Sequence, residues 1–210
     1  CPMVIANMSK KDHDPSKPQR LSSCGRPTPW LHLALLDPDC NPVPEGEPGE
    51  ICVRGPLIMK GYKDMPEQTA EAFAGGWLHT GDVGKLDEDG FLYIVDRTKD
   101  MIVTGGFNVF PREVEDVLGT HEAVGQVVVI GVPDEQWGEA VKAVVVLKPG
   151  FAAGEDLAHA MQSLVKEAKG SVQAPKSVDF VDAIPLTPVG KPDKKAVRAQ
   201  YWQGSDRGVG

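Results

Sequence analysis

Two valine-rich segments separated by a turn constrain the fold of this chain more than any other feature. Residues 124–132 and 139–147 are long apolar runs, and residues 133–138 between them are turn formers. Because β-branched side chains favour strands, the pattern predicts two neighbouring strands. In residues 156–168 the apolar side chains recur at helical spacing, which predicts a helix with one apolar face. The second half therefore carries enough apolar surface for a core of its own.

Shorter signals complete the second half. Pro111 begins a predicted helix over residues 111–118, because proline suits the first helical position. Residues 177–181 predict a strand, residues 184–192 a loop with three prolines, and residues 193–202 a closing helix. These elements predict a short, mainly antiparallel sheet flanked by helices.

Turn residues dominate the first half, which predicts short strands. Apolar runs at 31–36 and 50–54 predict two strands, and 78–85 and 91–95 predict a hairpin around an Asp-Glu-Asp-Gly turn. We also expect a short helix at 66–73 and a polar loop over 9–29. Since this half offers little apolar surface, we expect it to be the edge of a larger domain.

Composition excludes several classes of protein. The net charge is −8 and the pI about 5.1, so a broad binding surface for nucleic acid or anionic lipid is not expected. No stretch approaches the length of a membrane span, and the first residues do not resemble a signal peptide, so we expect a cytoplasmic protein. The chain begins with Cys rather than Met, and we interpret it as a piece of something longer. Four cysteines without zinc-ligand spacing predict neither a metal site nor a disulfide scaffold.

Lys191 is the strongest candidate for chemistry. Gly190-Lys191 invites a phosphate-loop interpretation, but prolines stand at 185 and 192 where that motif needs glycine and Ser/Thr, so the interpretation fails. A lysine at the threshold of a helix is disfavoured by the helix dipole, which leaves a role outside the helix. Its ammonium could bind phosphoryl or carboxylate oxygens, although a solvated lysine is equally compatible with the spacing. For Lys194, Lys195 and Arg198 we favour solvated helix residues.

Two glycine motifs and the histidines give weaker signals. Asp82 follows Gly81 at the mouth of the hairpin, where a carboxylate could accept hydrogen bonds from ribose hydroxyls or could be an ordinary turn residue. Gly105-Gly106 has no third glycine for a dinucleotide motif, yet two glycines let a thin chain approach the backbone. The five histidines show no catalytic or metal-ligand spacing, and we interpret each as structural or solvated.

Six motifs in order resemble one family. Gly61-Tyr62 and the segments 76–82, 87–94, 96–102, 105–115 and 185–191 together look like the C-terminal part of the AMP-forming acyl-CoA synthetases, in the adenylate-forming superfamily. The resemblance implies an α+β chain: a partial β-barrel subdomain at 1–96 that ends the large domain, a hinge at 97–99, a mobile AMP-binding C-terminal domain at 100–203 and a tail at 204–210.

The resemblance also implies site residues. Asp82 and Arg97 match the residues that contact the ATP ribose, and Lys99 matches the hinge position. Lys191 matches the catalytic lysine that bridges carboxylate and α-phosphate oxygens during adenylation. Residues matched to the binding of CoA and its pantetheine are Gly105, Gly106, Trp137 and Lys176. The CoA match is incomplete, because residues 172–176 keep only Pro175 and Lys176 of the usual run.

The implied activity is that of an acid:CoA ligase. ATP and a carboxylic acid, fatty or aryl, would give an acyl-adenylate and then an acyl-CoA thioester; Mg²⁺ would arrive with ATP at a site mostly outside this chain. A noncatalytic module and an adenylation domain that loads a carrier protein are the alternatives. The motif around Lys191 also resembles the acetylation site of these ligases, so a regulatory acetyltransferase is an expected partner. The sequence leaves open whether the protein forms a homo-oligomer.

Overall fold

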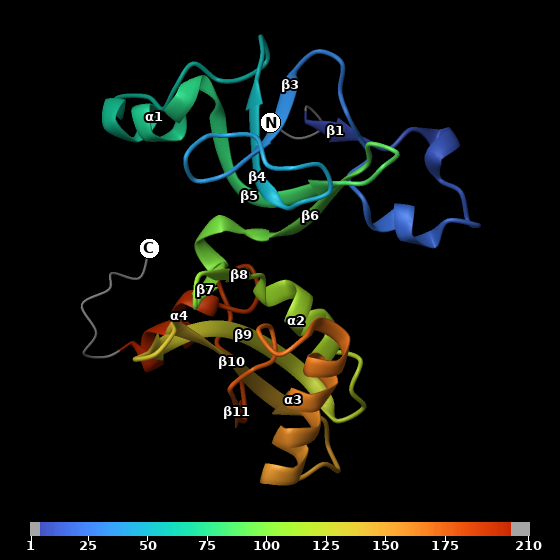
Figure 1. The fold of residues 1–210 in the computed structure, drawn as a ribbon, viewed down its shortest axis with the longest axis vertical. Coiled ribbons are helices and arrows are strands. Elements are labelled where there is room, and N and C mark those ends of the chain that lie inside the picture. Colours follow the sequence, from blue (N-terminus) through green and yellow to red (C-terminus); the bar gives the residue numbers. More distant parts are fainter. Residues whose placement is uncertain (1–4, 203–210) are drawn as a thin grey trace. The chain divides into compact units, whose positions relative to one another are not determined.

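The computed structural model describes residues 5–202, which divide into two compact units. The N-terminal unit extends to Thr98 and the C-terminal unit starts at Lys99 (Figure 1). Cys1 and the predicted tail at 204–210 lie outside the described residues. Each unit contains its own helices and its own sheet, which is antiparallel in the N-terminal unit and mainly antiparallel in the C-terminal unit, so the predicted α+β class is confirmed. None of the helices in the described part of the chain is long and apolar enough to cross a membrane.

An open four-stranded sheet forms the N-terminal unit. Its strands are β3 (His32–Leu36), β4 (Gly49–Arg54), β5 (Leu78–Leu86) and β6 (Leu92–Arg97), antiparallel and adjacent in chain order. The helix α1 (Pro66–Ala72) lies between β4 and β5 in sequence, and the short strands β1 (Ala6–Asn7) and β2 (Arg26–Pro27) pair separately. The core is small, with Leu31, Ile51, Val53 and Leu92 buried at its centre.

The segment at 9–29 is more ordered than the predicted loop. It contains 3₁₀ turns at Lys10–Asp12 and Pro18–Ser22 as well as β2. The guanidinium groups of Arg20 and Arg26 lie 4.8 and 4.5 Å from the ring centroid of the buried Phe91. These cation–π contacts span a long stretch of sequence, so local polarity could not reveal them.

The C-terminal unit is built on the predicted pair of long strands. β9 (Val124–Asp134) and β10 (Gly138–Leu147) are antiparallel, and β11 (Ser177–Phe180) runs parallel to β10. The hairpin of β7 (Ile102–Thr104) and β8 (Phe107–Val109) extends the sheet beside β10. These two three-residue strands were not predicted, because they are too short to show periodicity.

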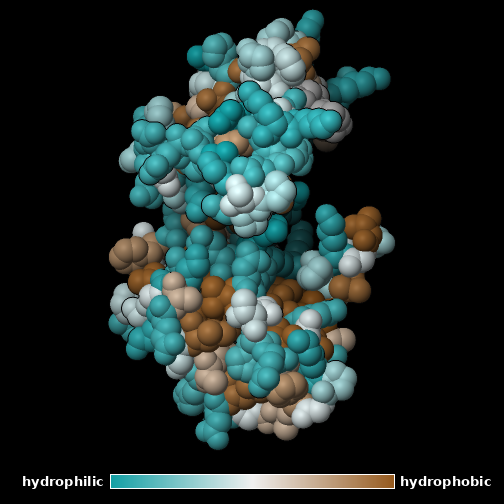
Figure 2. All heavy atoms as spheres, turned by 90° about the vertical axis from the view of Figure 1, so that its right-hand side faces the viewer, coloured by the Kyte–Doolittle hydropathy of each residue, from teal (hydrophilic) through white to brown (hydrophobic). Residues whose placement is uncertain are grey.

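Helices cover both faces of this sheet. Val114 of α2 (Pro111–Leu118) and Met161 of α3 (Glu155–Lys169) pack with Val129 and Val141 on one face. Val197 of α4 (Lys194–Tyr201) packs on the other face, where Val128, Ile130 and Val144 are buried. Successive strand residues therefore serve opposite cores, which explains why the strands are continuously apolar. In the view of Figure 2, apolar side chains are also more frequent on the C-terminal unit than on the N-terminal unit.

Two hydrogen bonds fix the C-terminal end of α4 to the sheet, and an ion pair between β10 and β11 supports one of them. The Tyr201 hydroxyl donates to Asp179 Oδ2 at 2.7 Å, and Lys142 Nζ donates to Asp179 Oδ1 at 2.8 Å. The indole Nε1 of Trp202, just after α4, donates to the Gly131 carbonyl at 3.0 Å. Burial alone would raise the pKa of Asp179, but the hydrogen bonds from Lys142 and Tyr201 outweigh it and lower the pKa. Burial and the Asp179 contact raise the pKa of Tyr201 to about 12.

We expect Tyr201→Phe to lower the free energy of unfolding by about 1 kcal/mol at pH 7, the usual value of one such hydrogen bond. A raised pKa stabilises the fold below the unfolded-state value and loses that contribution as pH rises through the folded-state value. The wild-type chain should therefore lose stability between about pH 10 and pH 12, and the variant less so. Urea unfolding at pH 7 and pH 10.5 measures both effects. Tyr62→Phe, at an exposed position of the other unit, is the control; equal pH dependence in all three chains would contradict this role for Tyr201.

Candidate functional site

Lys191 lies in the loop at residues 186–192, whose two ends are joined by hydrogen bonds and a β-bridge. The amide of Thr187 donates to the Lys191 carbonyl at 2.7 Å, and the Lys191 amide donates to Thr187 Oγ1 at 3.1 Å. Leu186 and Pro192 form an isolated β-bridge at the base of the loop, and Gly190 takes a φ of +79°, which favours glycine. Lys191 itself is exposed, and no ion pair within residues 5–202 involves its side chain. The loop thus presents an unpaired ammonium to solvent.

The helix after this loop corrects the prediction of solvated basic residues. Lys194 Nζ lies 2.9 Å from Glu115 Oε1, and the two side chains are only 21% and 18% exposed. Arg198 Nη2 lies 2.7 Å from Oε1 of Glu139, which is buried. Only Lys195 remains exposed as predicted. The acidic partners come from α2 and β10, so the helix sequence alone gave no sign of these ion pairs.

Asp82 and Arg97 form an ion pair across two strands. They are directly opposite in the pairing of β5 with β6, and Arg97 Nε lies 3.4 Å from Asp82 Oδ1. The side chains are 35% and 62% exposed, so both retain access to solvent. Gly81 takes a φ of +74°, and the Asp82 amide donates to Thr80 Oγ1 at 3.2 Å. The geometry presents a carboxylate acceptor beside a guanidinium donor, which can bind vicinal hydroxyls of a sugar.

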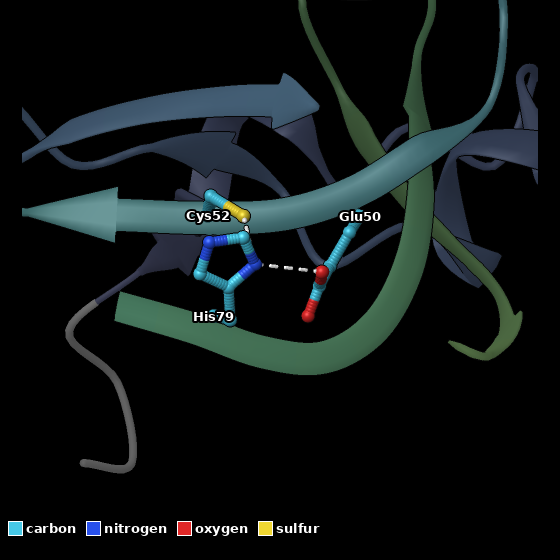
Figure 3. Close-up of side chains that lie close together, drawn as sticks. All are labelled: Glu50, Cys52 and His79. Carbon is cyan, nitrogen blue, oxygen red and sulfur yellow. Dashed lines mark hydrogen bonds and ion pairs between the residues drawn. The ribbon is translucent and has the colours of Figure 1, made fainter. Parts of the chain in front are cut away.

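The irregular part of β5 just before Asp82 is supported by a cluster that no local sequence pattern predicted. Glu50 Oε1 accepts a hydrogen bond from the Gly81 amide at 2.9 Å, while Glu50 Oε2 lies 2.8 Å from His79 Nδ1. Cys52 Sγ lies 3.4 Å from the same nitrogen (Figure 3). Spacing along the chain could not show this cluster, because its members lie on two strands. The available signal was the alternation of Glu50 and Cys52 on one strand.

We expect Cys52 to be the least reactive of the described thiols. Its side chain is buried, and burial raises its pKa to about 12, with Glu50 and Cys40 adding to the effect. At pH 8 this gives about 10³-fold less thiolate than an ordinary cysteine, and the thiolate is the nucleophile. Timed alkylation with iodoacetamide, followed by peptide mass spectrometry, should leave Cys52 unmodified while Cys24 and Cys40 react. All three should react in urea; rapid native labelling of Cys52 would contradict the prediction.

Of the predicted CoA residues, the structure brings Gly105 and Trp137 together. The Gly105 amide donates to the Trp137 carbonyl at 2.9 Å, and a Cβ at Gly105 would lie 2.6 Å from Trp137 Cε3. Trp137 is 46% exposed, and Phe107 after the glycine pair is 60% exposed. Gly106 has open space where a side chain would stand. Glycine is therefore required at 105 to seat the indole.

Lys176 lies further along the sheet. Its amide donates to the Val141 carbonyl, and its Nζ donates to the Ser171 carbonyl at 2.9 Å. The ammonium therefore already holds a carbonyl, which does not prevent it from binding a phosphate.

Lys99 begins the C-terminal unit. It lies in the 3₁₀ turn Thr98–Asp100, and its carbonyl accepts a hydrogen bond from Arg198 Nη1 at 3.4 Å. The same guanidinium binds Glu139, whose Oε2 accepts from the Val103 amide at 2.9 Å. The backbone after the Lys99 carbonyl is thus tied to the C-terminal unit.

Family comparisons match both ends of the chain. Residues 113–191 match the model of the AMP-binding enzyme C-terminal domain, and residues 1–63 match the model of the AMP-binding enzyme itself. The chain belongs to the AMP-binding enzymes. The resemblance read from the six motifs is therefore confirmed.

Curated relatives of this AMP-binding enzyme are ligases. The chain is 60% identical, over its whole length, to the medium/long-chain-fatty-acid–CoA ligase FadD8 of Mycobacterium tuberculosis, of which it covers 37%. It is 45% identical over 84% of its length to a long-chain-fatty-acid–CoA ligase of Escherichia coli, of which it covers 31%. A feruloyl-CoA synthase of Amycolatopsis is 43% identical over 87% of the chain, which covers 37% of that relative. The chain thus spans about a third of the length of these relatives.

Solved structures agree with this assignment. The amide bond synthetase McbA of Marinactinospora thermotolerans superimposes with a TM-score of 0.79 and 42% identity, over 94% of this chain and 39% of that one. The o-succinylbenzoate CoA synthetase MenE of Bacillus subtilis, in complex with its acyl-adenylate intermediate, gives a TM-score of 0.75 and 34% identity, over 93% of this chain and 38% of that one. The fold and the family are therefore the same by sequence and by structure.

Proposed function

We propose that these residues are the C-terminal part of an ATP-dependent carboxylic acid:CoA ligase. The protein would convert an acid and ATP to an acyl-adenylate and pyrophosphate, and then transfer the acyl group to the CoA thiol with release of AMP. The 60% identity to a fatty-acid–CoA ligase over the whole chain carries this proposal. A fatty acid is the first candidate substrate, and an aryl acid is the second because of the likeness to a feruloyl-CoA synthase.

Asp82 and Arg97 are the proposed nucleotide-binding pair. The Asp82 carboxylate would accept hydrogen bonds from the ribose hydroxyls, and Arg97 would hold the carboxylate and contact the ribose. Their 3.4 Å contact and partial exposure support this role. The contact from Glu50 to the Gly81 amide would keep the Asp82 backbone in place before the nucleotide binds.

Lys191 is the proposed catalytic residue for adenylation. Negative charge develops on the phosphoryl oxygens as the carboxylate displaces pyrophosphate, and a preorganised cation stabilises that charge. The exposed side chain on a closed backbone loop supports this role, because the ammonium is free to move while its backbone is not. The same exposure would admit a protein acetyltransferase, and acetylation would remove the charge. Mass spectrometry of Lys191 after treatment with an acetyltransferase, alongside adenylation assays, tests that regulation.

Residues 97–99 are the proposed hinge, with 1–96 as the end of the large domain and 100–203 as the mobile domain. The division into units at Lys99 supports this proposal, as does the hold of Arg198 on the Lys99 carbonyl. Because this hydrogen bond ties the Lys99 carbonyl to the C-terminal unit, the backbone torsions before that carbonyl would be the ones that change when the domain rotates. The exposed Trp137 and Phe107 around Gly105 and Gly106 support a pantetheine-binding role for this face.

The complete protein tests the proposal. In the presence of MgATP, medium-chain and long-chain fatty acids should support ATP–pyrophosphate exchange, and an aryl acid should be tested for comparison. Acyl-CoA should appear only when CoA is added. Absence of exchange with every acid would contradict the proposed reaction. A carrier protein as acceptor is the second candidate, because a fatty acid–[acyl-carrier-protein] ligase of Streptomyces coeruleorubidus is 39% identical over 90% of the chain. Acyl transfer to a carrier protein in preference to CoA would favour it.

A further inference from the structure

Three side chains with no direct contact to the substrates in the proposed reaction converge at the pairing of β4 with β5. Cys52 and His79 are directly opposite in the register, and Glu50 precedes Cys52 by two residues, which places it on the same face of the strand. A carboxylate oxygen, a sulfur and an imidazole nitrogen from these residues all lie within 4.8 Å of one another. Cys52 is fully buried, and the side chains of His79 and Glu50 are 17% and 19% exposed.

The hydrogen bond of His79 Nε2 determines whether Nδ1 of the neutral ring acts as a donor or an acceptor. Nε2 lies 3.1 Å from the Ala74 carbonyl oxygen, and a carbonyl can only accept, so Nε2 carries a hydrogen. In a neutral ring, Nδ1 then directs a lone pair at Glu50 Oε2, 2.8 Å away, and at Cys52 Sγ, 3.4 Å away. Two acceptors facing each other at this distance require a cation between them, either a proton or a metal ion.

We propose that Glu50, Cys52 and His79 bind a divalent transition metal ion of the zinc type. Zinc in proteins is tetrahedral, with bonds of about 2.3 Å to sulfur and about 2.1 Å to nitrogen and oxygen. Those bonds would place nitrogen about 3.6 Å from sulfur and about 3.4 Å from oxygen. The observed nitrogen–sulfur separation of 3.4 Å already fits, and the nitrogen–oxygen contact of 2.8 Å needs about half an ångström of opening.

The contacts around the three ligands are those of a supported metal site. Histidine ligands usually donate their other N–H to a carbonyl or carboxylate, as His79 does to Ala74. Glu50 keeps its second oxygen on the Gly81 amide at 2.9 Å, which orients the carboxylate. A nitrogen, sulfur and oxygen donor set favours Zn²⁺ or Co²⁺ over Mg²⁺ and Ca²⁺, which prefer oxygen. Cys40 Sγ lies 3.9 Å from Nε2 rather than near Nδ1, so we leave it outside the ligand set.

Binding of Co²⁺ to the 210-residue chain tests the proposal. Co²⁺ must displace the proton of the Cys52 thiol, which is released to solvent on binding. The thiolate bound to Co²⁺ then gives a charge-transfer absorption, which we expect to grow to one equivalent and to disappear when Zn²⁺ is added. Cys52→Ser should abolish the band, and Glu50→Gln should weaken Co²⁺ binding by more than the roughly 10–100-fold that loss of an outer-shell partner costs, because it removes a ligand. Cys24→Ser and Cys40→Ser are the matched controls, because they remove a thiol outside the ligand set.

Two outcomes would overturn the proposal. One is a charge-transfer band that survives in Cys52→Ser, and the other is a wild-type chain that binds no Co²⁺ or Zn²⁺, which would assign the cation between Glu50 and His79 as a proton. Since Cys52 is buried, its variant could misfold, so circular dichroism must show a native spectrum. If it does not, X-ray absorption of Zn²⁺ in the wild-type chain decides: one sulfur with nitrogen and oxygen neighbours supports the site, and any other sulfur count refutes it.

Discussion

Replacement of Lys191 by alanine is expected to slow acyl-adenylate formation by roughly 10²–10³-fold, the usual cost of removing one preorganised group that stabilises charge in a transition state. The change should leave the fold intact, because the side chain is exposed and the loop is closed by backbone contacts and by Thr187. ATP–pyrophosphate exchange in the complete protein measures the effect. Lys191→Arg should retain part of the rate, since it keeps the charge but not the shape of the ammonium.

Two comparisons make this result specific. Lys195→Ala removes another exposed cation nearby and should leave the exchange rate within about twofold of wild type, because Lys195 lies on α4 outside the Lys191 loop and the proposed reaction gives it no contact with the substrate. Supplying the acyl-adenylate directly should restore thioester formation in Lys191→Ala, because the lysine acts before that step. Unchanged exchange in Lys191→Ala would refute the catalytic role.

Replacement of Lys99 by proline is expected to separate the two half-reactions. Proline fixes its own φ near −65° and disfavours the helical region for the preceding residue, here Thr98 in a 3₁₀ turn. If the C-terminal unit must turn about this position, one orientation is lost. We expect one half-reaction to fall on the order of 10²-fold, a cost that a small misplacement of reacting groups can reach, while the other continues.

The measurement for this variant needs both assays on the same preparation. Pyrophosphate exchange reports adenylation, and acyl-CoA formed from supplied acyl-adenylate and CoA reports thioester formation. Lys99→Ala is the matched control, because it removes the same charge and leaves the backbone free; both of its rates should stay within a few-fold of wild type. Wild-type rates for both steps in Lys99→Pro would show that position 99 is not a hinge.

Local sequence patterns predicted most of the architecture. The strands at β9 and β10, the helices α2 and α3 and the start of α4 at the capping residue Asp193 follow from periodicity and turn chemistry that act within a few residues. The strands β7 and β8 escaped prediction because three residues give no period, and their pairing depends on a glycine turn and on β10.

In the candidate sites, too, residues in local motifs could be predicted from the sequence, whereas their partners from other elements could not. Asp82 and Lys191 stand next to glycines in recognisable motifs, so the chain itself marked them. The partners of neighbouring residues do not lie in those motifs: Glu50 reaches Gly81 from another strand, and Glu139 and Glu115 pair with Arg198 and Lys194 of the helix that follows Lys191. Contacts of this kind depend on the register of the sheet and on how the helices pack, which no local pattern encodes.

The closed backbone around Lys191 divides that segment into parts with different freedom to vary. Val189 at the tip is 80% exposed, whereas Thr187 and Asp193 hold the base through hydrogen bonds to the loop and to the first turn of α4. Mutational drift should accumulate at the tip without consequence and be purged at the base. A library randomised over this segment would then recover functional clones that are diverse at position 189 and nearly invariant at positions 187 and 193 on either side of it.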